Sequence, residues 1–132
     1  MLILQRYGPL LGRILLSAIF ILSGVGKITN PSFDGDQMKA KGIPAVTAFL
    51  ILALIAEIAG AISILTGAKA RFGALGLFVY LVAVTVVMHN FRAYAGPELV
   101  HQMENFMKNL AIMGGLLLVT VFGAGPISFD NR

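Results

Sequence analysis

The sequence predicts an all-α integral membrane protein, a bundle of four transmembrane helices with both termini on the same side of the membrane. Of its 132 residues, 58% are hydrophobic and only 12% are charged, too few to cover a water-soluble surface. Four apolar segments each approach the roughly 20 residues that a helix needs to cross a bilayer. The chain is too short for an additional soluble domain, so we expect a single domain over residues 1–132.

The four predicted spans are separated by polar sequence or turn signals. The first covers residues 8–28, and the loop after it carries Asn-Pro and Asp-Gly pairs, which are typical of turns. The second covers residues 44–66 and opens with a proline, which suits the first turn of a helix. The third, residues 72–91, follows the tight turn GAKAR, and the fourth, residues 106–122, lies between the loop RAYAGPELVHQMEN and the sequence GAGP. Such short loops favour antiparallel neighbours in a bundle.

Composition excludes several functions. The chain has no cysteine, which excludes disulfide exchange, thiolate metal sites and haem attachment through cysteine. Its two histidines accompany lysines that repel cations, so we expect no metal site. The net charge of +4 is spread over span ends and loops, which indicates contact with the lipid surface and no nucleic-acid partner. The ten basic residues divide equally between the two sides, so the positive-inside rule does not orient the bundle.

One face of the first span is polar or small. Its residues are spaced four, three, four and three apart, and they are Arg13, Ser17, Phe20, Gly24 and Lys27. This spacing places them on one side of a helix, and a lipid-facing side would be apolar. We therefore predict that this face points into the bundle. The alternative is that Arg13 and Lys27 only extend their charged ends to the two membrane surfaces.

Glu57 is the only charged residue between Lys41 and Lys69. A carboxyl group near mid-bilayer costs roughly 2.5–3.5 kcal/mol, so it requires a partner, a proton or a function. Helical rise places Glu57 about 14 Å and Arg13 about 8 Å from the same surface, which predicts an Arg13–Glu57 pair and leaves Lys27 out of reach. Glu57 is either a functional residue or a packing residue that a salt bridge or a proton neutralises.

A second polar group is expected near the span ends that the two longer loops connect. Its members are Lys27, His89, Asn90, Lys108 and Asn109. Together they could bind an anionic or quinone-like group through hydrogen bonds. The alternative for His89 alone is an ordinary residue of the membrane interface.

The sequence resembles the DoxX family of small four-span bacterial membrane proteins over nearly its whole length. The similarity rests on GRILLSAIFILSGVGKI, FDGDQMKAKGIP, AEIAGAISILTGAKAR, MHNF, FMKNLAIMGGLLLV and GAGPISFD, in this order and spacing. The resemblance implies a bacterial inner-membrane location with cytoplasmic termini. Members are often labelled oxidoreductases, and the family name refers to a membrane subunit of a thiosulfate:quinone oxidoreductase. The family-like polar positions are Arg13, Lys27, Glu57, His89, Lys108 and Asn109, without assigned roles.

Three functions remain open on these grounds. The first is a redox-associated module that binds a quinone or another small molecule, or that supports a partner redox protein. The second is a non-catalytic membrane anchor or assembly subunit, and the third is a proton-linked transporter that uses Glu57. Without cysteine, the chain itself provides no thiol redox centre, so a quinone or a partner would carry electrons. Catalysis and assembly into a homo-oligomer are both left open.

Overall fold

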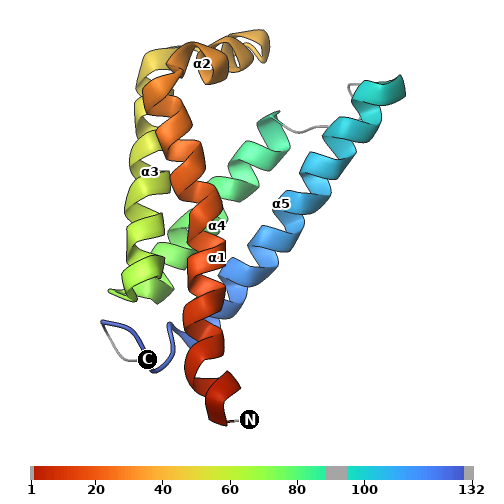
Figure 1. Cartoon of the computed structure of the whole chain (residues 1–132). Coiled ribbons are helices and arrows are strands. Elements are labelled where there is room, and N and C mark those ends of the chain that lie inside the picture. Colours follow the sequence, from red (N-terminus) through yellow and green to blue (C-terminus); the bar gives the residue numbers. More distant parts are fainter. Residues whose placement is uncertain (1, 89–94, 130–132) are drawn as a thin grey trace.

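The structure is a computed structural model that describes residues 2–88 and 95–129 (Figure 1). These residues form helices and connecting segments without a strand, and the helices are α1 (Leu2–Thr29), α2 (Pro31–Ala40), α3 (Val46–Thr66), α4 (Ala70–Met88) and α5 (Gly96–Phe122). Within the described residues, four helices are long and apolar enough to cross a membrane, and these are α1, α3, α4 and α5. The predicted all-α, four-span architecture is therefore confirmed.

Two helices begin six or more residues earlier than predicted, whereas α4 begins two residues earlier and α3 begins two residues later, after Pro44 and not with it. α1 starts at Leu2 instead of residue 8, because the Gly8-Pro9 pair lies inside the helix and does not begin it. α5 starts at Gly96 instead of residue 106. Pro97 occupies its first turn, where a missing N–H is tolerated, and Glu98 adds a negative charge near the positive end of the helix dipole. The segment interpreted as a loop thus contains the first turns of α5.

The connection after α1 is also more ordered than predicted, because it contains the ten-residue helix α2. Asn30 precedes this helix and Pro31 occupies its first turn, so the Asn-Pro pair marks a helix start and not only a turn. α2 lies across the ends of α1 and α3 that are remote from the N-terminus (Figure 1). Gly35 is buried there, and a Cβ at this position would be 3.5 Å from Val46.

The long helices pack in the order α1, α3, α4, α5, whereas α1 and α5 meet over only a short stretch. The two pairs α1–α3 and α4–α5 diverge towards the end that carries α2 (Figure 1). At the opposite end they share one apolar core, which consists of Phe20, Ala61, Ile64, Ala74, Leu77, Leu81, Met113 and Leu116. This divergence opens space between the pairs at the α2 end.

Small residues allow the close approaches in this core. A Cβ at Gly24 would lie 2.4 Å from Ile58, and a Cβ at Gly60 would lie 2.5 Å from Cγ of Leu77. The polar face predicted for the first span is confirmed, since the buried residues of α1 are Arg13, Ser17, Phe20, Gly24 and Lys27. Glu57, Gly60 and Ala61 are likewise buried together on α3.

The segment after α5 folds back over the end of the bundle where α1 begins (Figure 1). The backbone N–H of Phe129 donates a hydrogen bond of 2.8 Å to the carbonyl of Thr66 at the end of α3. The first residues of α1 and this C-terminal segment therefore lie at one end of the bundle. The placement of this end in the cytoplasm stays a prediction.

Candidate functional site

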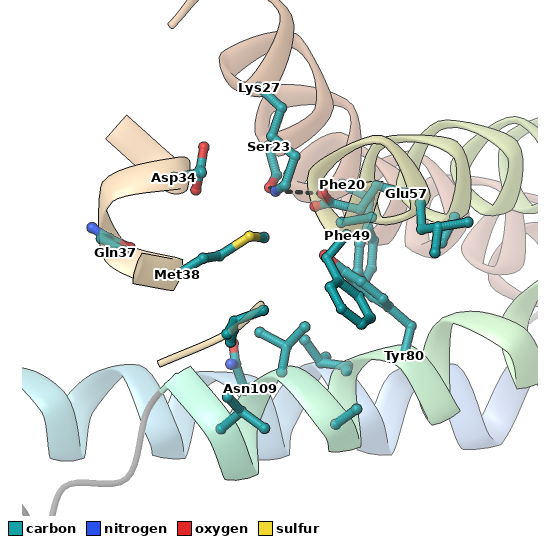
Figure 2. Close-up of a pocket in the computed structure, with 18 of the residues that line it drawn as sticks. Phe20, Ser23, Lys27, Asp34, Gln37, Met38, Phe49, Glu57, Tyr80 and Asn109 are labelled. Atoms are coloured by element: carbon teal, nitrogen blue, oxygen red, sulfur yellow. Dashed lines mark hydrogen bonds and ion pairs between the residues drawn. The ribbon is translucent and has the colours of Figure 1, made fainter. Parts of the chain in front are cut away.

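A cavity of about 790 Å³ occupies the space between the diverging helix pairs (Figure 2). Every helix contributes to its lining, as do Ile43 and Pro44 between α2 and α3. Most lining side chains are apolar, including Phe20, Phe49 and Leu81. Its size falls within the range of roughly 300–1,000 Å³ typical of small-molecule sites.

Lys27 and Glu57 form an ion pair inside this cavity, with 2.5 Å between Nζ and Oε1. Glu57 projects from the middle of α3 and is only 3% exposed, and Lys27 projects from the last turn of α1. Lys27 Nζ also donates a hydrogen bond of 3.0 Å to Oγ of Ser23, one turn earlier on α1. The predicted Arg13–Glu57 pair is therefore wrong, and so is the expectation that Lys27 lies out of reach.

The error lies in the relative height of α1 and α3. The prediction measured height from residue 8 and Thr66 as if both lay at one surface. In the structure Arg13 already lies beside Ile64 and Leu65, close to the end of α3. Gly24 lies against Leu54 and Ile58, which brings Lys27 within about one helical turn of Glu57. The register between two helices depends on such packing contacts, which hydropathy does not encode.

Arg13 has a different environment. Its Nη1 donates hydrogen bonds to the carbonyls of Ile64 at 3.1 Å and Leu65 at 3.0 Å, and its Nη2 donates to the carbonyl of Ile127. These carbonyls belong to the last turn of α3 and to the C-terminal segment, so Arg13 joins α1 to both. Arg13 is absent from the cavity lining.

Tyr80 is a cavity residue that the sequence interpretation missed. Its side chain extends from α4 towards Glu57 (Figure 2). Tyr80 and Glu57 line the same cavity from neighbouring helices. A signal was available, because a tyrosine in the middle of an apolar span needs a partner for its hydroxyl, whereas tyrosines usually occupy span ends.

The predicted polar group is brought together in part. Asn109 is buried and donates a hydrogen bond of 3.1 Å from Nδ2 to Oγ1 of Thr85, which links α5 to α4. Lys108 lines the same cavity from an exposed position on α5. His89 and Asn90 lie outside the described residues. From the predicted group the cavity thus contains Lys27, Lys108 and Asn109, and Glu57 lines it as well.

α2 adds a polar face that the loop interpretation missed. Asp34, Gln37 and Met38 all line the cavity (Figure 2). Their spacing of three and four residues places them on one side of the helix, which was the available signal. The lining therefore combines carboxylates, ammonium groups, amides and hydroxyl groups with apolar walls. Such a site can hold the polar end of an amphipathic molecule without exposing its apolar part to water.

The fold and this site define a small multi-pass helical membrane protein with an internal, mainly apolar cavity. The DoxX family model matches residues 8–90, and the chain belongs to the DoxX family. The resemblance noted from the sequence is confirmed. The match includes the ion pair and Tyr80, and it ends before Lys108 and Asn109.

Curated relatives agree with this assignment. The chain is 35% identical to the inner membrane protein YqjF of Escherichia coli over 97% of its own length and 93% of that protein. It is 34% identical to the inner membrane protein YphA of the same organism, covering 93% and 88% of the two chains. Together with the four apolar helices, these relatives place the protein in the bacterial inner membrane as a multi-pass protein.

A more distant relative comes from yeast. Over 77% of its length the chain is 33% identical to the ER-derived vesicles protein ERV29 of Saccharomyces cerevisiae, and it spans 37% of that protein. No solved structure matches the chain.

Proposed function

We propose that this protein is a membrane module that binds a small amphipathic molecule, such as a quinone, in the cavity between its helix pairs. The observation that carries the proposal is an ion pair, Lys27–Glu57, that lies in the wall of a mainly apolar cavity. Charged groups within a membrane span are costly and usually mark a binding site or pathway. Here they coincide with space large enough for a ligand.

The alternatives receive less support. A pure assembly subunit is expected to have a well-packed bundle without a pocket, which differs from the cavity of about 790 Å³. A proton-linked transporter needs Glu57 to exchange its proton freely, and the ion pair with Lys27 opposes that exchange. The proposal includes redox chemistry of the bound molecule, either on this protein alone or with a partner protein.

A pair of alanines on α3 allows a direct test. Ala56 lines the cavity, whereas Ala59 is exposed on the outer surface of the same helix. In lipid nanodiscs, Ala56→Phe should fill part of the cavity and weaken binding of 2-methyl-1,4-naphthoquinone at least roughly tenfold, a change of about 1.4 kcal/mol. Ala59→Phe should bind like the unaltered protein. Isothermal titration calorimetry measures both.

A second variant and a stability measurement distinguish a filled cavity from a misfolded protein. Ala83→Phe narrows the cavity from α4, and unfolding temperatures show whether each variant retains its fold. Mass spectrometry of lipids extracted from the purified protein should also detect a retained quinone that Ala56→Phe loses. Equal binding by folded Ala56→Phe, Ala83→Phe and Ala59→Phe would exclude the cavity as the ligand site.

A further inference from the structure

The charges in the cavity lining balance. The described lining residues include two cationic side chains, Lys27 and Lys108, and two carboxylic acids, Asp34 and Glu57. Asp34 comes from α2 and Lys108 from α5, so the balance extends across both sides of the cavity. An anionic ligand would gain attraction from the lysines and lose it again through repulsion from the carboxylates. The described lining residues therefore provide an anion with no net attraction.

The Lys27–Glu57 contact makes an anion less favourable still. Both side chains are buried, and the carboxylate has little access to water. An anion that took Lys27 away from Glu57 would leave a buried carboxylate without its counter-charge. Breaking a buried pair in this way is strongly destabilising. A ligand can therefore contact Lys27 favourably only if the Lys27–Glu57 ion pair stays intact.

A neutral acceptor can share Lys27 with Glu57. An ammonium group has three N–H donors, and the described contacts of Nζ direct two of them to Oε1 of Glu57 and Oγ of Ser23. The third can donate to a ligand carbonyl or hydroxyl oxygen while the ion pair stays intact. Tyr80 lines the same cavity, and its hydroxyl adds a group that both donates and accepts hydrogen bonds.

The walls beside these polar groups suit a flat or extended apolar body. Phe20, Phe49 and Leu81 line the cavity, and rings that stack or meet edge to face bind favourably to such aromatic side chains (Figure 2). These apolar walls therefore share one cavity with the Lys27–Glu57 pair.

From these contacts we infer that the cavity selects an uncharged ligand with a hydrogen-bonding carbonyl or hydroxyl head, and that Tyr80 and Lys27 contact this head. The inference deepens the proposed function and rests on it. It separates two ligand classes that the sequence left open, because an anion and a neutral quinone-like head both match a cluster of lysines and asparagines.

Two naphthoquinones of nearly equal shape test the charge preference. In the unaltered protein at neutral pH, neutral 2-methyl-1,4-naphthoquinone should bind at least roughly tenfold more tightly than 2-hydroxy-1,4-naphthoquinone, which is an anion there. Glu57→Gln keeps the size of the side chain and leaves the Lys27 charge uncompensated. In this variant the preference should reverse in favour of the anion.

The role of Tyr80 has its own matched comparison. Tyr80→Phe keeps the ring and removes the hydroxyl, so the neutral quinone should bind roughly tenfold more weakly, the loss expected for one hydrogen bond near a charged group. Tyr7→Phe makes the same change at an exposed position of α1 and should leave binding unchanged. Unfolding temperatures should be similar for both variants.

The outcomes distinguish this inference from the proposed function. Equal or tighter binding of the anion to the unaltered protein, with Ala56→Phe still weakening binding, overturns the neutral-ligand inference and leaves the cavity as the binding site. Binding of neither naphthoquinone, with Ala56→Phe and Ala59→Phe indistinguishable, overturns both. The comparison within the unaltered protein decides the question even if Glu57→Gln does not fold.

Discussion

Arg13 shows how a charged residue inside a span can serve stability instead of ligand binding. It is 2% exposed and donates hydrogen bonds to carbonyls at the end of α3 and in the C-terminal segment. The last carbonyls of a helix have no partner within that helix, and they carry the negative end of its dipole. A guanidinium group can donate hydrogen bonds to several of these carbonyls, and its permanent positive charge is attracted to the negative end of the dipole.

Replacing Arg13 should therefore lower the stability of the protein, even though Arg13 does not line the cavity. We expect Arg13→Leu to reduce the free energy of unfolding by about 3 kcal/mol, since buried carbonyls lose their donors. Arg71→Leu, at an exposed position of α4, should change it by less than about 0.5 kcal/mol. Denaturant unfolding in detergent, followed by circular dichroism, measures both. A comparable loss in the two variants would contradict the capping role of Arg13.

The polar residues differ in how well the sequence predicted them. The spacing of Arg13, Ser17 and Lys27 was sufficient to identify the inward face of α1, because helical periodicity is a local property. The partner of Glu57 was not predictable in this way. It depends on how far α1 slides along α3, and contacts such as Gly24 against Ile58 set that position. Tyr80 was overlooked because it stands alone among apolar residues.

Among the helices, the contact between α3 and α4 is especially sensitive to side-chain size. A Cβ added to Gly60 would come within 2.5 Å of Cγ and 2.8 Å of both Cδ atoms of Leu77. Leu77 is almost fully buried in the core, so it has no free space into which to move. The absence of a side chain at Gly60 therefore sets the distance between these helices.

A glycine-to-alanine pair tests this contact. Gly60→Ala should destabilise the protein by about 1–3 kcal/mol, because overpacking a dense core forces side chains or helices apart. Gly76→Ala changes a glycine of α4 with open space around its Cβ, and the better helix propensity of alanine should stabilise by up to about 1 kcal/mol. Thermal unfolding of both variants gives the comparison. Stabilisation by Gly60→Ala would show that α3 and α4 adjust without strain.

Helix existence was more predictable than helix ends. The four long apolar segments specified the four spans, since crossing a bilayer requires length and hydrophobicity that few other structures need. α2 was missed because half of its ten residues are polar or charged and its start resembles a turn. The early start of α5 was missed because residues 96–105 carry charges that the hydropathy pattern assigns to a loop.

At the scale of the whole molecule, the two ends of the bundle differ in packing. The end that holds the start of α1 is closed, because Arg13 and the hydrogen bond from Phe129 to Thr66 tie α1, α3 and the C-terminal segment together. The end that carries α2 is where the helix pairs diverge and the cavity lies (Figure 1). The orientation of the protein in the membrane therefore decides which compartment lies next to the cavity.

The absence of cysteine makes that orientation measurable, because an introduced cysteine is the only thiol in the chain. Gln5 and Ser32 are both exposed and lie at opposite ends of the bundle, on α1 and α2. With cytoplasmic termini, a membrane-impermeant maleimide added to intact spheroplasts should label Ser32→Cys readily, whereas Gln5→Cys should react only after the inner membrane is permeabilised. The opposite labelling pattern would place the termini outside and the α2 end of the cavity next to the cytoplasm. Ligands and redox partners would then reach the cavity from the cytoplasmic side.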